Sequence, residues 1–219
     1  MNFYFFDLDG TLEDSREDMA RSVNAVRELL GLNLREIDDV KKHVNRGMHD
    51  LYVSCFDDFF SNSAHYETAY EKVKTEYEKH YLENICIKSF CYDNIEKVLE
   101  EFAKNSKIIV ITNKPEKHSR ALLVSLGINQ YITDVMGGDS CAEMKPSPLP
   151  LQISAKRNNF SFENDKAFMI GDSAGDIQAG KAFGAKTIWC SYGYIKSYGS
   201  IKPDYTINSP HELLTLAMQ

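Results

Sequence analysis

Two aspartates, Asp7 and Asp9, follow the apolar run F-Y-F-F near the start of the chain, and Gly10 and Thr11 come next. Because side chains two apart in a strand point to the same side, we expect both carboxylates on one side of a strand end. Open α/β sheets build their sites at the carboxyl ends of their strands, and Gly10 would let the backbone turn close to a bound group. Two such carboxylates repel each other, so a divalent cation or a proton must offset their charge. A D-G turn with capping aspartates is the competing structural explanation.

A hydroxyl and an amide, Thr112 and Asn113, end a second apolar run, K-I-I-V-I, just before a helix expected to begin near Pro115. Both side chains can donate hydrogen bonds to a phosphate, helped by the unpaired backbone amides of the helix start. N-capping of that helix explains the two residues equally well when they are taken alone.

One lysine, Lys145, lies in the string G-G-D-S-C-A-E-M-K-P-S-P, between a predicted strand and a helix that opens with proline. A lone lysine in a loop is usually solvated. Beside clustered carboxylates, however, an ammonium group would relieve their repulsion and bind a phosphate oxygen.

Another predicted strand ends in Gly171 and Asp172, and Asp176 follows four residues later in the next helix. Asp172 is therefore placed like Asp7, and Asp176 can reach it as a direct metal ligand or as a supporting residue. Oxygen ligands with no His or Cys nearby favour magnesium over zinc or copper. Asp176 also fits the ordinary role of an acidic residue in the first turn of a helix.

The elements that must position these residues are short apolar runs that alternate with helical patterns, which is typical of repeated β-α units. The predicted fold class is α/β, with a doubly wound, mostly parallel, Rossmann-like sheet and an inserted α-helical domain. The predicted strands are residues 3–6, 107–112, 132–136, 167–170, 187–190 and 204–207. Helices that cover the sheet are predicted from two sets of apolar residues at helical spacing: Ile95, Val98, Leu99 and Phe102, and Ala121, Val124 and Leu126.

Residues 14–83 lack a convincing strand and carry successive helix-period patterns. We therefore expect a helical domain inserted into an α/β core made of residues 1–13 and 84–219. One helix face in this insert carries an aromatic stripe, for which core packing is favoured over a ligand-facing surface. The stripe consists of Tyr66, Tyr70, Val73, Tyr77 and Tyr81.

Bulk composition limits the classes of function. A chain of 219 residues with 43% hydrophobic content can bury a large core or a core with a smaller insert. A formal net charge of −7 argues against a nucleic-acid polymer as partner, because phosphate backbones are held mainly by clustered Lys and Arg. The five cysteines are scattered, with no C-x-x-C pair, and are expected to be reduced thiols. Without a signal-peptide pattern or an apolar run of about 20 residues, we expect a cytoplasmic protein with no membrane partner.

Taken in order, the four clusters resemble the motifs of the haloacid dehalogenase superfamily: D-x-D-x-T, a Thr or Ser at a strand end, a Lys, and G-D-x-x-x-D. The longer strings D-L-D-G-T-L-E-D-S, T-N-K-P, K-P-S-P and G-D-S-A-G-D-I-Q-A-G are similar to the phosphoglycolate phosphatase-like branch. That branch carries a helical cap directly after the first motif, where residues 14–83 lie. The resemblance covers the whole core and implies a phosphoric monoester hydrolase.

Roles for the acidic residues follow from the resemblance. It implies that Asp7 is the nucleophile that takes a phosphoryl group and forms an aspartyl-phosphate. Asp9 would be the general acid and base. Mg²⁺ would be held by Asp7, the backbone carbonyl of Asp9, and Asp172, and Asp176 would support the metal side.

The phosphate-binding side, by the same resemblance, would be formed by Thr112 and Lys145, which stabilise charge on the transferring group. Gly10 and Asn113 would line the same pocket and contact the substrate. The dehalogenating branch of the superfamily lacks the second aspartate of the first motif, so Asp9 favours phosphoryl transfer over dehalogenation.

Substrate choice would depend on the cap, where the patterns are less specific. Asn45 and Arg46 stand beside Gly47 at an expected break between helices, where Arg46 could bind an anionic substrate; a solvated loop arginine explains it as well. Lys41 and Lys42 raise the alternative of a Schiff-base lysine, as in the related phosphonatases, although adjacent lysines on an acidic helix are more often solvated.

The predicted function is magnesium-dependent hydrolysis of a small phosphorylated metabolite, which is a phosphoglycolate-like compound, a sugar phosphate, a nucleotide or pyrophosphate. A sugar phosphomutase of the β-phosphoglucomutase type is an alternative, because it forms the same aspartyl-phosphate. A non-enzymatic binding protein on the same fold is a second alternative, although no motif residue is lost. We expect a monomer or a homodimer.

Overall fold

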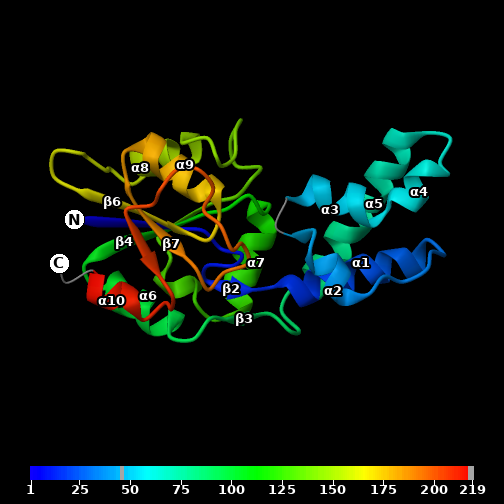
Figure 1. The fold of residues 1–219 in the computed structure, drawn as a ribbon, viewed down its shortest axis with the longest axis horizontal. Helices are drawn as coiled ribbons and strands as arrows, with labels where there is room; N and C mark the ends of the chain where they lie inside the picture. Colours follow the sequence, from blue (N-terminus) through cyan, green and yellow to red (C-terminus); the bar gives the residue numbers. More distant parts are fainter. Residues whose placement is uncertain (45–46, 217–219) are drawn as a thin grey trace. The chain divides into compact units, whose positions relative to one another are not determined.

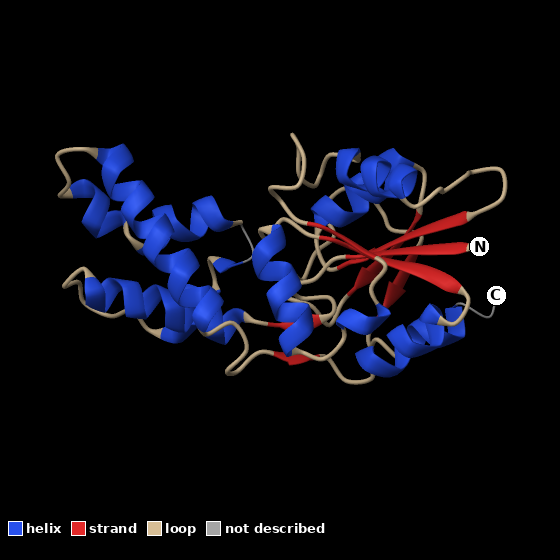
Figure 2. Ribbon diagram, turned by 180° about the vertical axis from the view of Figure 1, so that it is seen from behind, coloured by secondary structure: helices blue, strands red, loops and turns tan. Residues whose placement is uncertain are grey.

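The computed structural model describes residues 1–44 and 47–216. The chain forms two compact units: residues 1–14 together with 90–219, and residues 15–89. The large sheet belongs to the first unit, and the second unit is built of helices (Figures 1 and 2).

The first unit contains a fully parallel six-stranded sheet in the order β5-β4-β1-β6-β7-β8. Its strands are β1 (Asn2–Phe6), β4 (Ser106–Ile111), β5 (Asp134–Met136), β6 (Lys166–Gly171), β7 (Lys186–Cys190) and β8 (Tyr205–Ile207). All six predicted strands are present, and the α/β prediction is confirmed. The chain runs outward from β1 through β4 to β5 and then returns to β6 on the other side of β1. Sheets of this type form their ligand sites where the strand order reverses in this way.

Helices cover both faces of this sheet (Figure 2), with α6 (Ile95–Ala103) and α10 (Glu212–Leu216) on one face and α8 (Leu149–Arg157) and α9 (Ala174–Phe183) on the other. The central strand β1 is therefore apolar on both sides. Phe5 belongs to the core cluster beneath α8 and α9, while the ring of Tyr4 stacks on Phe102 of α6 with centroids 4.0 Å apart. This explains why the run F-Y-F-F is continuous rather than alternating.

The helix α7 (Glu116–Ser125) follows β4 and leads to the 3₁₀ turn η2 (Asn129–Tyr131). Its existence was predicted, but its buried face was not. Val124 is 60% exposed, and Leu122 and Leu123 are buried instead. The periodicity was too short to set the rotation of the helix.

A two-stranded antiparallel sheet, β2 (Glu13–Asp14) and β3 (Phe90–Cys91), lies where the chain leaves the first unit and returns to it. It was not predicted. The sequence placed the seams at 13/14 and 83/84, whereas the compact units divide at 14/15 and 89/90. Residues 87–89 stay with the second unit because their backbone amides donate hydrogen bonds of 2.8–3.1 Å to the carboxylate of Asp18.

The second unit consists of five helices among its described residues: α1 (Arg16–Leu29), α2 (Ile37–Lys41), α3 (Met48–Cys55), α4 (Asp57–Ser61) and α5 (Tyr66–Glu83). The α5 helix packs on α1 and carries the tyrosine stripe. Val73, Tyr77 and Tyr81 are buried, whereas Tyr66 at the start of the helix is exposed. Core packing is therefore confirmed for the C-terminal part of the stripe.

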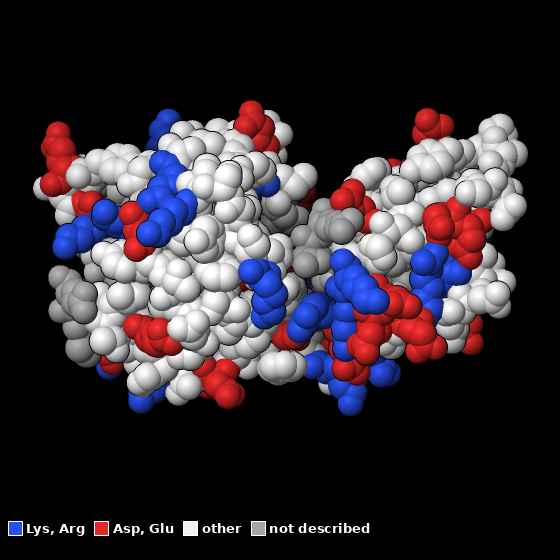
Figure 3. All heavy atoms as spheres, in the orientation of Figure 1, with Lys and Arg blue, Asp and Glu red and all other residues white. Residues whose placement is uncertain are grey.

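Three further features concern the cysteines, the hydrophobicity of the helices and the surface charge. All five cysteines are free thiols. Within residues 1–44 and 47–216, no helix combines the length and apolar character that a membrane crossing requires. Basic and acidic side chains are intermingled on the face that Figure 3 shows.

Candidate active site

The sheet brings the four sequence clusters to one edge. Phe6 at the end of β1 is in register with Val110 of β4 and Ile170 of β6, so Asp7 emerges beside the ends of both neighbouring strands. The side chains gathered there are largely buried. They are Asp7, Thr112, Lys145, Asp172 and Asp176.

Lys145 joins two of these carboxylates. Its Nζ lies 2.7 Å from Oδ1 of Asp7 and 2.6 Å from Oδ1 of Asp176. Burial alone would lower the pKa of this ammonium group, but the two carboxylates outweigh burial and raise it above its usual range. Lys145 is therefore a permanent cation against the predicted nucleophile.

Asp176 is fixed on both of its oxygens. While Oδ1 accepts from Lys145, Oδ2 accepts hydrogen bonds from the backbone N–H and the hydroxyl of Ser173, at 2.9 and 2.6 Å. The Ser173 hydroxyl in turn accepts from the Asp176 N–H, which completes a capping box at the start of α9. The start of α9 therefore both caps the helix and orients the ammonium group of Lys145.

Asp172 is held by a loop that the sequence interpretation missed. Its Oδ2 accepts from the backbone N–H of Tyr194 at 2.6 Å and of Ile195 at 3.2 Å, in the segment that follows β7. A side chain at Gly193 would overlap both Asp172 and the carbonyl of Gly10. The glycines of the string S-Y-G-Y and of D-L-D-G are therefore needed for close approach rather than for flexibility alone.

Asp7, Asp172 and Asp176 form a buried cluster whose oxygens lie within 4.8 Å of one another. Burial raises the pKa of Asp172 to about 7, and Asp176 adds to this rise. Burial, followed by Asp176, also raises the pKa of Asp7, against the opposing effect of Lys145. When all three carboxylates are ionised, one lysine offsets only one of the three negative charges, so the cluster can accommodate a divalent cation, and its hard oxygen donors suit Mg²⁺.

Asp9 contacts a second lysine that the sequence interpretation overlooked. Oδ1 of Asp9 lies 2.6 Å from Nζ of Lys114, whose side chain is only 2% exposed. Lys114 is the third residue of the string T-N-K-P. The signal available in the sequence was its position directly after the predicted phosphate-binding residues, at the same edge of the sheet as Asp9.

Thr112 and Asn113 have structural contacts of their own. The Thr112 hydroxyl accepts from the N–H of Lys114 at 3.2 Å. The Asn113 side chain forms two 3.0 Å hydrogen bonds with the backbone of Lys145, donating to its carbonyl and accepting from its N–H. Asn113 thus anchors the lysine loop, while its role in binding substrate stays a prediction.

The predicted cap residues are only partly described. Asn45 and Arg46 lie outside the described residues. Lys41 lies 3.5 Å from Asp38, and Lys42 lies 2.5 Å from Asp39, each one helical turn away. Pairs of this kind are common for lysines on helices, and a Schiff-base role for either lysine stays a prediction.

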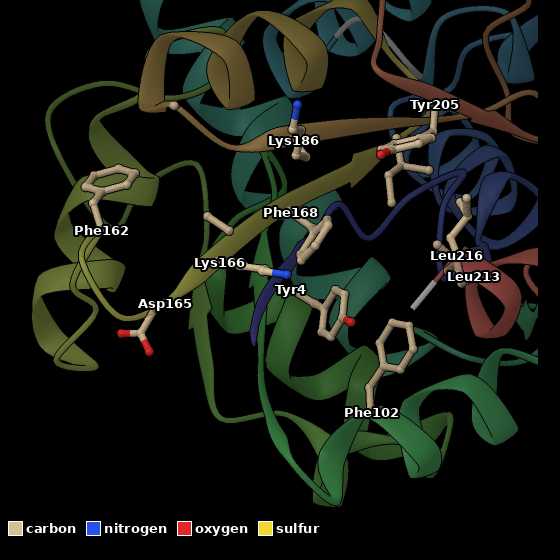
Figure 4. Close-up of a pocket in the computed structure, with 13 residues that line it drawn as sticks. Tyr4, Phe102, Phe162, Asp165, Lys166, Phe168, Lys186, Tyr205, Leu213 and Leu216 are labelled. Atoms are coloured by element: carbon tan, nitrogen blue, oxygen red, sulfur yellow. The ribbon is translucent and has the colours of Figure 1, made fainter. Parts of the chain in front are cut away.

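The pocket in Figure 4, of about 580 Å³, lies elsewhere. It is lined by Tyr4, Phe102 and Phe168 and by residues at the beginnings of β6 and β7, including Lys166 and Lys186. Because the strands are parallel, this is the sheet edge opposite the carboxylates. The pocket is therefore separate from the candidate active site.

Comparisons with known proteins show the family of the chain. A family model described as haloacid dehalogenase-like hydrolase matches residues 4–190. The phosphoglycolate phosphatase of Aquifex aeolicus is 35% identical over 99% of this chain and 96% of its own length, and that of Haemophilus influenzae is 31% identical over 96% of each. The crystal structure of a predicted phosphoglycolate phosphatase from Haemophilus somnus is 28% identical, with a TM-score of 0.84 over 98% of this chain and 97% of that one.

Proposed function

The chain belongs to the haloacid dehalogenase-like hydrolase family and is a phosphoric monoester hydrolase, and we propose that it hydrolyses phosphoglycolate or a similarly small phosphorylated metabolite with Mg²⁺. The observation that carries this proposal is the buried group in which Lys145 contacts Asp7 beside Asp172. Relatives at 31–35% identity that carry the name phosphoglycolate phosphatase support the choice of substrate.

In the first half-reaction, a carboxylate oxygen of Asp7 attacks phosphorus in line with the leaving oxygen. The bond between phosphorus and the leaving oxygen breaks, and its electron pair stays with that oxygen. Asp9 donates a proton to the leaving oxygen, so this oxygen departs as a neutral hydroxyl group and Asp7 holds the phosphoryl group.

In the second half-reaction, water attacks the phosphorus of the aspartyl-phosphate. Asp9, now ionised, takes a proton from the water. The bond between phosphorus and the Asp7 oxygen breaks, its electron pair returns to the carboxylate, and inorganic phosphate leaves. Asp9 is thereby protonated again and Asp7 is restored.

The remaining residues bind and orient. Lys145 faces Asp7 as a fixed cation and would neutralise a phosphate oxygen in the transition state, and the Thr112 hydroxyl would donate to another. Asp7, the Asp9 carbonyl and Asp172 would hold Mg²⁺, with Asp176 in support. When bound, Mg²⁺ would shield the negative charges that otherwise repel the incoming phosphate.

The two compact units take different roles in this proposal. Residues 1–14 and 90–219 form the catalytic core, and residues 15–89 act as the cap that selects the leaving group. Arg46 is the proposed cap contact for an anionic substrate such as a carboxylate. We also propose that the enzyme is cytoplasmic and that it is a monomer or a homodimer.

A phosphate-release screen tests this proposal. Phosphoglycolate, pyrophosphate, sugar phosphates and nucleotides are each incubated with the protein, with Mg²⁺ and with EDTA. We expect Mg²⁺-dependent release with phosphoglycolate among the best substrates. Release from none of these compounds, or undiminished release in EDTA, would contradict the proposal.

Analysis of the reaction products distinguishes a phosphatase from the alternative, a sugar phosphomutase. A structure proposed to be β-phosphoglucomutase from Thermotoga maritima shares the fold with a TM-score of 0.73 at 19% identity, so the fold alone does not distinguish the two activities. With glucose 1-phosphate, a mutase yields glucose 6-phosphate and a phosphatase yields free phosphate. We expect free phosphate only.

A further inference from the structure

Asp9 and Lys114 form a partly buried ion pair that the phosphoryl-transfer chemistry described above does not use. The two residues are 105 positions apart in the sequence, and the distance from Nζ to Oδ1 is 2.6 Å. The Lys114 side chain is 2% exposed and that of Asp9 is 22% exposed. The carboxylate thus reaches toward solvent while the lysine lies behind it.

Lys114 is held from its backbone. Its N–H donates to the Thr112 hydroxyl, and its carbonyl accepts from the N–H of Gly138 at 2.9 Å. Pro115, which follows, is the N-cap of α7. An ammonium group buried on such a fixed loop keeps its place only while it is paired, because an unpaired buried charge is very costly.

The site therefore has a separate lysine for each aspartate of the first motif. Lys145 contacts Asp7, and Lys114 contacts Asp9. The two lysines come from different loops, one after β4 and one after β5. Removal of Lys114 should thus affect Asp9 more than Asp7, and removal of Lys145 should affect Asp7 more than Asp9.

We propose that Lys114 is the positioning residue for Asp9, and that it fixes the direction in which Asp9 delivers its proton. With Oδ1 bound to Lys114, proton transfer to the leaving oxygen falls to Oδ2. This inference rests on the proposed phosphatase function. If Lys114 positions Asp9, loss of Lys114 should lower kcat/KM most for substrates whose leaving group needs a proton.

The test compares two substrates in the Lys114→Met variant. The leaving group of phosphoglycolate, or of another alkyl phosphate that the parent hydrolyses, would be a basic alkoxide without a proton from Asp9, so its departure depends on Asp9. The leaving group of p-nitrophenyl phosphate is a stable phenolate, whose departure does not. The parameter is kcat/KM, which includes only steps up to the first irreversible one and so omits the later attack of water.

We expect kcat/KM of Lys114→Met to fall about 100-fold or more for the alkyl phosphate and less than about tenfold for the aryl phosphate. The reason is that general acid catalysis accelerates such reactions by about 10²–10⁴-fold. Asp9→Asn should show the same selectivity. The double variant should lose little more than Asp9→Asn alone, because both changes remove one function.

Controls separate positioning from damage to the fold. Lys117→Met removes an exposed lysine from the start of the next helix and should leave both substrates at parental rates. Lys114→Arg keeps a cation and should recover part of the alkyl phosphate rate. If Lys114→Met does not fold, the parent and Lys114→Arg are compared in the same way, and a selective loss is still expected.

Equal losses for the two substrates in Lys114→Met or Lys114→Arg, or full additivity with Asp9→Asn, would overturn the inference. A parent with no activity on any phosphate would instead contradict the proposed function. The two failures are therefore distinguishable.

Discussion

Asn113 and Lys145 are joined by a reciprocal pair of 3.0 Å hydrogen bonds between the amide side chain of one and the backbone of the other. The first residue lies in the loop that follows β4, and the second carries the ammonium group that contacts Asp7. The loop that carries Lys145 is therefore held to the loop at the end of the neighbouring strand.

Replacing Asn113 should release that loop. In Asn113→Ala both backbone groups of Lys145 lose their partner, and we expect kcat to fall about tenfold or more, because misplacement of a charged group by even 1 Å is costly in catalysis. Steady-state kinetics on the best substrate measures this. Asn129→Ala, an exposed asparagine in η2, is the control and should behave like the parent. Parental kcat in Asn113→Ala would show that these hydrogen bonds are dispensable.

Gly193 is predicted to tolerate no side chain. A Cβ there would overlap Asp172 and the Gly10 carbonyl, so Gly193→Ala must displace the loop whose amides hold Asp172. We expect a higher Mg²⁺ concentration for half-maximal activity and a loss of about tenfold or more at saturation. Gly175→Ala is the matched control, since its Cβ would meet only ordinary contacts of 3.5 Å or more. Similar Mg²⁺ dependence in the two variants would contradict the role given to the loop.

The metal-free protein should become less stable as the pH rises toward 7. Burial raises the pKa of Asp172 to about 7, whereas an ordinary carboxyl group titrates near ~4. Between these values the folded protein keeps a proton that the unfolded chain has lost, so the contribution of Asp172 to stability falls as the pH rises through this window. Binding of Mg²⁺ needs the ionised form and should strengthen over the same range.

Asp172→Asn isolates this effect. At pH 8 in EDTA its Tm should equal or exceed that of the parent, and added Mg²⁺ should raise the Tm of the parent only. Thermal unfolding with and without Mg²⁺ at pH 5 and pH 8 provides the comparison. A variant that is less stable than the parent in EDTA at pH 8, or one still stabilised by Mg²⁺, would count against this assignment.

Arg27 should be the main polar support of the second unit. Its buried guanidinium donates to the carbonyls of Asn33 and Cys55 and makes two hydrogen bonds to Asp58. Arg27→Met leaves buried acceptors unpaired, and we expect a loss of about 2–4 kcal/mol in the free energy of unfolding by urea. Asp57→Ala breaks a pair in which the acid is 65% exposed and should cost less than about 1 kcal/mol. Equal losses of unfolding free energy in Arg27→Met and Asp57→Ala would contradict the greater importance given to Arg27.

The parts of the fold that were predictable are those set by local pattern. The run F-Y-F-F is buried on both faces of a parallel sheet, and such strands are continuous in hydrophobicity and easy to recognise. The pair β2 and β3 was missed because each strand has two residues and depends on a partner more than 70 positions away. The buried face of α7 was missed because three apolar positions do not set a helix phase.

The site shows the same division. Asp7, Asp172 and Lys145 were predicted to lie together because each stands at the end of a recognisable strand or in a loop motif, and the structure brings them together. Gly193 has no such local mark, and Lys114 is marked only by its position directly after Thr112 and Asn113. Their importance comes from Asp9 and Asp172, which only the folded sheet brings beside them.

Asp7 carries the central claim, and phosphate release by Asp7→Asn tests it most directly. The side chain keeps its size and its ability to bind a metal through oxygen, but it loses the charge and nucleophilicity needed to accept a phosphoryl group. With Mg²⁺ and either phosphoglycolate or p-nitrophenyl phosphate, we predict turnover by the parent and a loss of about 10³-fold or more in Asp7→Asn. Turnover by Asp7→Asn at the parental rate would contradict the assignment of Asp7 as the nucleophile.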